Sequence, residues 1–261
     1  MPANYSIIYN TCDKYEFLWP GFFTLFKKYW PDFEQKIILN TETKSFQYPG
    51  LDIVRPGCGN PQASWSQRLI YALDSITTPY VLLILDDFWF KGPVRTEVLQ
   101  ECLNRLTRDH TVQSFTFAWQ PGPNTPDSIQ PEFEVRGRWA PYRINAQIAL
   151  WRVDYLRKIL RTYENPWQFE ISGSFRSSIY GGKLLSLKKT AAPVFDYDFG
   201  FLIIRGQLNK KVADYFAQAE GLNVTFPIQE FSENSGVKPR GDKPVRLFLY
   251  FKDMLVSLFR K

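Results

Sequence analysis

The chain has 261 residues, of which 44% are hydrophobic and 17% aromatic, so it can bury the core of one large α/β domain or two small ones. Its formal charge of +6 is a mild basic bias, which favours anionic partners such as nucleotide diphosphates, lipid phosphates or an acidic membrane surface. The absence of a dense Lys/Arg block and of any known nucleic-acid motif argues against nucleic acid as a partner. Three widely spaced cysteines and a single histidine argue against a disulfide framework, a zinc site and any chemistry built on several histidines.

The sequence also shows no targeting or membrane-spanning segment. A strand-like run begins at about residue 5, directly after the first four residues, which leaves no room for a signal peptide. No apolar run reaches the roughly 18 residues that a spanning helix needs. We therefore expect a cytoplasmic protein, either soluble or peripheral on the inner face of the cell membrane.

The first 80 residues alternate between strand-like and helix-like segments. Strands are expected at residues 5–10, 36–40 and 51–54, with polar residues at the ends of the first two. Asp13 could cap a helix that starts near Tyr15 and buries an aromatic face, and Ser64 could cap a second helix that ends before Pro79. A Gly/Pro-rich loop covers residues 56–61.

The second half continues the alternation. Helices are expected at residues 92–108 and 153–163 and from Pro166 onward, and strands at residues 114–119, 144–151 and 194–204, with an exposed loop at 120–132. This order of elements predicts an α/β fold with a Rossmann-like, mostly parallel sheet flanked by helices. The sequence has no GxGxxG loop, which argues against a dinucleotide cofactor.

Two adjacent carboxylates, Asp86 and Asp87, end an uninterrupted apolar run at residues 81–85. Such a run is typical of a strand buried on both faces, and ligands of open α/β sheets bind at the carboxyl ends of strands. Because an ionised Asp is rarely buried without a partner, the pair implies a cation, basic side chains or access to water. Oxygen ligands suit Mg²⁺ or Mn²⁺, which commonly arrive with a nucleotide's phosphates. Alternatively, Asp86 caps the following turn and Asp87 is solvated.

The C-terminal residues form a distinct section. We expect one domain over residues 1–230, a polar linker at 231–244 and an amphipathic helix at 245–261. The polar side of that helix holds Arg246, Asp253, Ser257, Arg260 and Lys261. A basic amphipathic helix suits an anionic bilayer surface, although packing against the domain or a second copy would explain it too.

Several segments, in order and spacing, resemble bacterial nucleotide-sugar glycosyltransferases of the GT-A fold, the kind found in capsule, O-antigen and exopolysaccharide gene sets. Three segments look like the first nucleotide-binding strand and its helix: NTCDKY (10–15), LWPGFF (18–23) and KYWPD (28–32). SWSQRL (64–69), followed by Asp86-Asp87, looks like the helix before the metal-binding signature. NAQIALW (145–151) and NPWQFE (165–170) look like the acceptor-side strand and the helix that bears the base. The likeness spans residues 5–210.

The resemblance implies roles for particular residues. Asp87 would bind Mn²⁺ or Mg²⁺, and Asp198 would replace the distal ligand, often His, that relatives supply late in the chain. The residues expected at the nucleotide sugar are Thr11, Asp13, Ser66, Arg68, Asp86 and Arg205. Arg68 and Arg205 would offset the charge of the diphosphate, although each could instead form a surface ion pair.

On the acceptor side the resemblance implies that Glu170 is the general base of an inverting reaction, with Glu164 as the nearby alternative. An aromatic setting would raise the pKa of Glu170, whereas a position in the first helical turn would lower it, and the residue could simply complement the helix dipole. Trp139, Arg143 and Trp167 are expected at the acceptor, although most tryptophans will be core and the arginines could be solvated.

The implied activity is hexosyl transfer from a nucleotide diphosphate sugar, most simply a UDP-sugar, to a glycan or lipid-linked glycan in polysaccharide biosynthesis. A sugar-phosphate nucleotidyltransferase is the first alternative. It would normally carry a Gly-rich, Arg-containing loop after the first strand, where this chain has Thr11-Cys12-Asp13-Lys14. A non-enzymatic, peripheral-membrane or glycan-binding module is the second.

Overall fold

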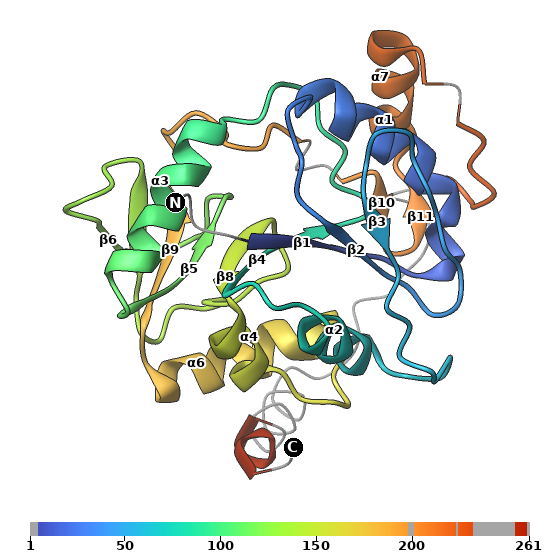
Figure 1. The fold of residues 1–261 in the computed structure, drawn as a ribbon. Coiled ribbons are helices and arrows are strands. Elements are labelled where there is room, and N and C mark those ends of the chain that lie inside the picture. The colour runs from blue at the N-terminus through green and yellow to red at the C-terminus, as the bar shows by residue number, and fades with distance from the viewer. Residues whose placement is uncertain (1–4, 198–200, 223, 232–253, 260–261) are drawn as a thin grey trace.

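The computed structural model describes residues 5–197, 201–222, 224–231 and 254–259. A nine-stranded sheet runs through them in the order β3-β2-β1-β4-β8-β5-β9-β7-β6 (Figure 1). The strands are β1 (Tyr5–Asn10), β2 (Ile37–Asn40), β3 (Ile53–Val54), β4 (Tyr80–Leu85), β5 (Val112–Thr116), β6 (Asn124–Pro126), β7 (Phe133–Arg136), β8 (Ala149–Arg152) and β9 (Lys183–Leu187). All but β7 and β8 run in one direction, so the predicted mostly parallel α/β sheet is confirmed.

Helices cover both faces of the sheet, as the unbroken apolar runs of β1 and β4 require. On one face lie α1 (Trp19–Tyr29), α3 (Thr96–Arg108) and α7 (Lys210–Glu220), and on the other lie α2 (Trp65–Asp74), α4 (Val153–Ile159) and α6 (Ser174–Tyr180). Each face has its own cluster of buried side chains. The α1 side is rich in phenylalanine and tryptophan, and the α2 side is mainly aliphatic.

The shorter elements lie at the sheet's edges and ends. They are the 3₁₀ helix η1 (Asp13–Leu18), α5 (Pro166–Gln168), the π-helical turn η2 (Phe169–Gly173), and the separate hairpin of β10 (Ile203–Ile204) and β11 (Gln207–Leu208). The predicted start of a helix at Pro166 is confirmed, and Asn165 and Gln168 form a reciprocal capping box there. The predicted cap at Asp13 is wrong, because Cys12 occupies the cap position and makes no side-chain cap bond.

The strand predicted at residues 144–151 is wrong in its first half, since β8 begins at Ala149. Side chains take the backbone N–H groups that a sheet ladder would otherwise use. Ser174 accepts from Ile144, Glu170 from Ala146, and Asn145 from Gln147. Residues 144–148 therefore form a loop at the end of the sheet.

Other predicted boundaries also shift, for identifiable reasons. The helix expected from residue 92 begins at Thr96, because Lys91 and Arg95 donate backbone hydrogen bonds to Asp196 and Val194. The helix expected at 153–163 ends at Ile159. The loop expected at 120–132 contains β6, which pairs with β7 as an edge hairpin. The run at 194–204 contributes one bridge, between Tyr197 and Phe90, and β10.

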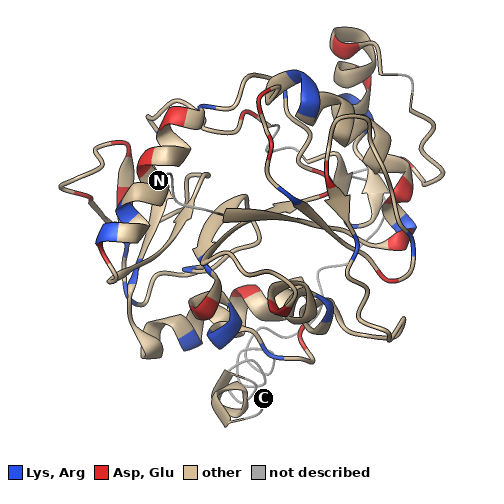
Figure 2. Cartoon of the chain, in the orientation of Figure 1, with Lys and Arg blue, Asp and Glu red and all other residues tan. Residues whose placement is uncertain are grey.

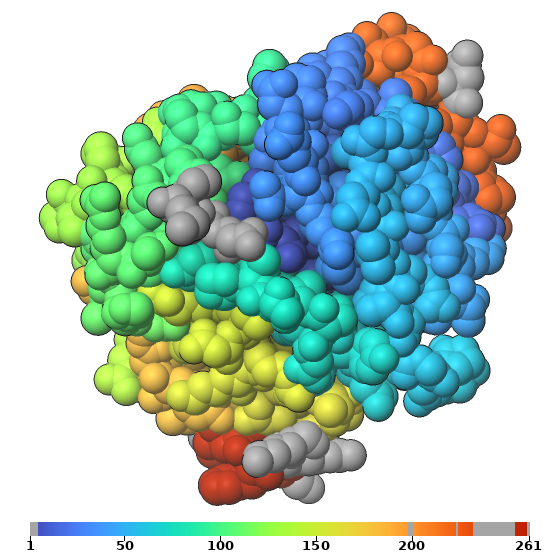
Figure 3. All heavy atoms as spheres, viewed as in Figure 1, coloured from blue at the N-terminus to red at the C-terminus, as the bar shows by residue number. Residues whose placement is uncertain are grey.

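The C-terminal part is described only over residues 254–259, which form a helix; most of the predicted linker and the start of the predicted helix lie outside the described residues. This short helix lies against the α4 side of the domain (Figure 3). Arg161 fixes it there, since its Nε donates to the carbonyl oxygen of Ser257 at 2.8 Å. No helix in the described ranges is long and apolar enough to cross a membrane.

Candidate active site

The end of β4 and the end of β1 lie side by side, because Asn10 pairs with Leu85 in the parallel register. The next residues along each strand therefore meet. The hydroxyl of Thr11 donates to Oδ2 of Asp86 at 2.5 Å, and it accepts from Nε1 of Trp19 at 2.9 Å. Thr11 and Asp86 are both buried, so this chain of hydrogen bonds fixes one carboxylate of the pair in a single orientation.

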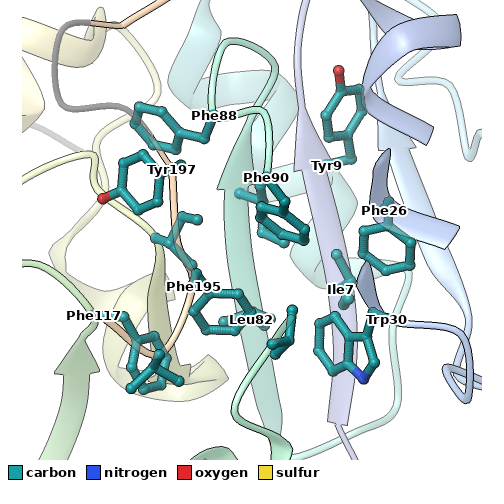
Figure 4. Close-up of a cluster of buried hydrophobic side chains, with 14 of the residues drawn as sticks. Ile7, Tyr9, Phe26, Trp30, Leu82, Phe88, Phe90, Phe117, Phe195 and Tyr197 are labelled. Carbon is teal, nitrogen blue, oxygen red and sulfur yellow. The ribbon is translucent and has the colours of Figure 1, made fainter. Parts of the chain in front are cut away.

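Aromatic side chains anchor the loop that carries the two carboxylates. Phe88 packs on Tyr197, and Phe90 packs among rings of α1 and on Phe195 (Figure 4). Trp89 lies so close to Gly21 of α1 that a Cβ atom there would come within 2.2 Å of the indole. Glycine is thus required at position 21, and the aromatic run that follows the acids holds them at the strand end.

The electrostatics of the pair favour a cation. Burial raises the pKa of Asp86 to about 7, and burial together with the neighbouring charge of Asp86 raises the pKa of Asp87 well above its ordinary value. Among the described residues no Lys or Arg forms an ion pair with either carboxylate. Two adjacent acids that repel each other fit a divalent ion, whose charge would offset both.

A complete metal site is not formed by the described residues alone. They contain no cluster of three or more His, Cys, Asp or Glu side chains placed to hold an ion. Asp198, the predicted second ligand, lies outside the described residues. The two aspartates would thus supply part of the coordination sphere, with the remainder left to phosphate oxygens and water, as is usual for Mg²⁺.

A second polar network joins the ends of β1 and β2. The carboxylate of Asp13 accepts from the backbone N–H groups of Thr43 and Lys44 at 3.0–3.1 Å. Burial works to raise the pKa of Asp13, but these hydrogen bonds outweigh it and lower the pKa. Glu42 accepts from the N–H of Asp13 at 2.6 Å and pairs with Arg68 at 2.7 Å. Arg68 is thus held beneath the β1 exit by an ion pair.

The turn at Arg205 and Gly206 approaches the same end of β1. A Cβ atom on Gly206 would lie 3.7 Å from the hydroxyl of Tyr15 and 3.8 Å from Nζ of Lys14. Arg205 has a positive φ of 53° and is exposed, so its side chain extends from a tight turn beside the β1 exit. Thr11, Asp13, Asp86 and Arg205 are therefore gathered at one end of the sheet.

Ser66 lies in a different environment. It is fully buried in the first turn of α2, and its N–H donates to the carbonyl oxygen of Glu164 at 3.1 Å. This places it in the contact between α2 and the segment before α5, not on the open end of the sheet. Glu164 in turn forms a fully buried ion pair with Arg176 at 2.6 Å, which ties its carboxylate into the interior.

Glu170 lies in the π-helical turn η2, a distortion that is frequent at functional sites. Its Oε1 accepts from the N–H of Ala146 at 2.9 Å, in the loop just before β8. Burial raises the pKa of Glu170, although the hydrogen bond from Ala146 opposes it. Of the two opposing directions considered from the sequence, the upward one prevails. The loop continues to Gln147, whose side-chain oxygen accepts from the hydroxyl of Tyr197 at 2.7 Å.

Tyr197 joins the two sides of the site. Its ring packs on Phe88 beside the acid pair, and the charge of Asp87 adds to burial in raising the pKa of its phenol. Figure 4 shows its ring at the same end of the strands as Phe88 and Tyr9. Glu170 and Tyr197 thus bind two neighbouring residues of the loop before β8, Ala146 and Gln147, and Tyr197 also lies beside the acid pair.

Of the three predicted acceptor residues, Trp139 and Arg143 lie beside α6, and Trp167 lies in α5. Trp167 and Trp139 are 70% and 63% exposed, and the Trp139 ring lies 6.4 Å from that of Phe175 on α6. Arg143 is buried, and its guanidinium donates to the carbonyl oxygens of Ser177 and Gly182. Two flat apolar surfaces are therefore open to a ligand, whereas Arg143 caps the end of α6.

Sequence reasoning missed Glu42, Gln147 and Tyr197 as site residues. Glu42 follows a strand with a polar exit, a signal that could have singled it out once β2 was placed next to β1. Gln147 and Tyr197 carry no local signal, because they are 50 residues apart and meet only in the folded chain.

No protein-family model matches the chain, and no curated protein matches its sequence. Solved structures do match its fold. S. aureus TarS 1-349, alone and in complex with UDP, gives a TM-score of 0.50 at 12% identity over 72% of this chain, and the match spans 59% of that chain. A Thermus thermophilus 2-C-methyl-D-erythritol 4-phosphate cytidylyltransferase matches less well, with a TM-score of 0.43 at 13% identity over 84% of this chain and 100% of its own. With its mixed sheet, two helical layers and C-terminal helix, the chain has the GT-A fold of nucleotide-sugar glycosyltransferases.

Proposed function

We propose that the protein is a metal-assisted glycosyltransferase that moves a sugar from a nucleotide diphosphate sugar, a UDP-sugar in the simplest case, to a glycan or lipid-linked glycan. The observation that carries the proposal is the pair Asp86 and Asp87 at the end of β4, which forms no ion pair with a described Lys or Arg. Asp86 is buried and held by Thr11, and Asp87 beside it is half-buried. The fold supports it, since S. aureus TarS 1-349, which matches this fold with a TM-score of 0.50, was solved in complex with UDP.

In this proposal the residues at the exits of β1 and β2 bind the nucleotide. Thr11 orients Asp86, and Asp13 holds the β1 exit against the loop at Thr43. Asp87 would hold Mn²⁺ or Mg²⁺ together with phosphate oxygens, and the ion would stabilise the charge that grows on the leaving diphosphate. Arg205 would add positive charge from the turn between β10 and β11.

Glu170 is the proposed general base of an inverting transfer. A carboxylate with a raised pKa is a better proton acceptor than an ordinary one, provided that it is ionised at the working pH. Its neighbour Glu164 is poorly placed for this role, because its carboxylate is fully buried and paired with Arg176 in the interior.

The proposal is tested by titrating the protein with UDP in a calorimeter, with and without Mn²⁺. We expect saturable UDP binding that Mn²⁺ tightens by at least about tenfold, because Asp87 would hold the ion and the ion would supply positive charge to the diphosphate. A binding module that merely exposes solvated aspartates would give no metal-dependent heat. A nucleotidyltransferase would instead release pyrophosphate when it is incubated with UTP and a sugar 1-phosphate.

We further propose that the C-terminal helix attaches the protein to an anionic membrane surface. Ser257 faces the domain, whereas Leu255, Val256 and Phe259 are 42%, 43% and 87% exposed. Arg157 and Lys158 of α4 line one cleft with Phe259, together with the acid Asp154, on the side of the molecule where the C-terminal helix lies (Figure 2). Exposed apolar side chains beside positive charge are what an interfacial helix presents to lipid.

Replacing Leu255 and Phe259 by Ser should weaken binding to phosphatidylglycerol vesicles by at least about tenfold, since each inserted side chain contributes roughly 1.5–3 kcal/mol. Vesicle flotation measures this directly. Ile129→Ser, which removes a 61% exposed apolar side chain elsewhere, serves as the matched control. Equal flotation of the double variant and the unmodified protein would exclude the helix as the anchor.

A further inference from the structure

A cleft of about 420 Å³ lies beside the candidate active site, at the carboxyl ends of β5 and β9. Its walls come from the β5 end (residues 117–119), the β9 end (187–191), Lys91 and residues 193–197. Its volume falls in the range of small-ligand sites, roughly 300–1,000 Å³. Tyr197 lines this cleft and donates to Gln147, in the loop that Glu170 also binds, so the cleft adjoins the proposed point of reaction.

Two lysines bring positive charge to the walls. Lys188 and Lys189 line the cleft, against one carboxylate among the described lining residues, that of Asp196. Lys91 lines it too, but its Nζ lies 5.6 Å from the centroid of the Tyr215 ring on α7, outside the cleft, so its charge is not counted. This carboxylate lies against the backbone at Gly92, where a Cβ atom would be 3.2 Å from Oδ2. The nearby Glu132 is paired with Arg95 and does not offset the lysines. Two ammonium groups on a concave surface attract an anion more strongly than the same charges on a convex one.

An aromatic surface accompanies this charge. Trp119 is 40% exposed at the mouth of the cleft, and Nζ of Lys189 lies 5.2 Å from the centroid of its ring. An indole offers a flat apolar surface to the C–H faces of a sugar ring, and an adjacent ammonium group can bind a charged substituent of that sugar. Neutral sugars would not need the lysines, and a simple anion would not need the tryptophan.

We infer that this cleft binds the acceptor and that the acceptor is a saccharide carrying an anionic group, phosphate or carboxylate, next to the hydroxyl that is glycosylated. The inference rests on the proposed glycosyltransferase function, which it deepens by naming the acceptor class. It places the acceptor at the ends of β5 and β9 and the nucleotide at the ends of β1 and β4, with Tyr197 between the cleft and the acid pair.

The test measures direct binding of four probes: trigalacturonate and mannose 6-phosphate, with maltotriose and mannose as their neutral counterparts. Quenching of tryptophan fluorescence and ligand-detected NMR report binding without any sugar transfer. We expect millimolar affinity for at least one anionic probe, at least about tenfold tighter than for its neutral counterpart, and weaker at high salt. A preference for trigalacturonate would identify a uronic acid acceptor, and a preference for mannose 6-phosphate a phosphorylated one.

Lys188→Gln with Lys189→Gln should reduce anionic binding by at least about tenfold, because two charge-assisted contacts are lost. Trp119→Leu should remove the fluorescence change and weaken the sugar contact. Lys36→Gln with Lys211→Gln, which removes the same charge from two other exposed positions, should leave binding unchanged. Equal affinity for anionic and neutral probes, or unchanged binding in the Lys188/Lys189 variant, would overturn the inference.

UDP titration of the same samples separates this inference from the proposed function. Failure of UDP to bind, with anionic saccharide binding intact, would overturn the glycosyltransferase and leave a saccharide-binding cleft. Normal UDP binding with no discrimination among the four probes would overturn the acceptor class alone.

Discussion

Asp87→Ala should lower sugar transfer at least about 10³-fold and remove the Mn²⁺-dependent part of UDP binding. Without Asp87 the ion would lose its proposed direct ligand, and with it several kcal/mol of stabilisation of the leaving diphosphate. The folded structure should tolerate the change. Asp87 accepts no hydrogen bond from a described side chain, and its charge is disfavoured by burial and by Asp86, so its removal relieves repulsion.

The measurements are calorimetry with UDP and Mn²⁺, donor hydrolysis, and thermal unfolding. Asp74→Ala provides the matched control, since Asp74 is an exposed acid at the end of α2 that pairs with Arg157 on the surface. The control should keep metal-dependent UDP binding and full turnover. Unchanged metal-dependent binding in Asp87→Ala would remove Asp87 from the metal site and leave the proposed mechanism without its basis.

The part of the site nearest to the sheet could be predicted because it follows from strand ends. An apolar run that stops at two acids places them at the carboxyl end of β4, and parallel pairing brings the β1 exit beside them. Local pattern was enough for Thr11, Asp13, Asp86 and Asp87, since each follows directly from a buried strand.

Prediction failed where side chains replaced the ladder of backbone hydrogen bonds. Residues 144–148 alternate like a strand, but Ser174, Glu170 and Asn145 bind their N–H groups, and this competition is visible only in the fold. The direction in which a residue faces was similarly hidden. Ser66 and Arg143 lie on segments close to the predicted site, yet both side chains turn into the interior. Their place along the chain could be read from the sequence, but the neighbours that bury their side chains could not.

Glu170→Gln should reduce turnover by at least about 10²-fold while UDP binding stays normal. The amide is nearly isosteric with the carboxylate, and its oxygen can still accept from the N–H of Ala146, so the loop before β8 should keep its conformation. Only proton acceptance is lost. Donor hydrolysis and transfer are measured side by side, because loss of the base should affect transfer to a hydroxyl and leave metal-dependent donor binding intact.

The pH profile tests the same role independently. A general base works only when ionised, and burial raises the pKa of Glu170, so kcat/KM should fall as the pH drops through a value above that of an ordinary glutamate. The Gln variant should lose this acidic limb. Glu164→Gln is the contrasting control: it leaves Arg176 without its buried partner, so stability should fall by about 3 kcal/mol while turnover per folded molecule is kept. Wild-type turnover in Glu170→Gln, or an acidic limb that survives the substitution, would move the base to another residue, and the π-helical turn would then serve only to brace the loop before β8.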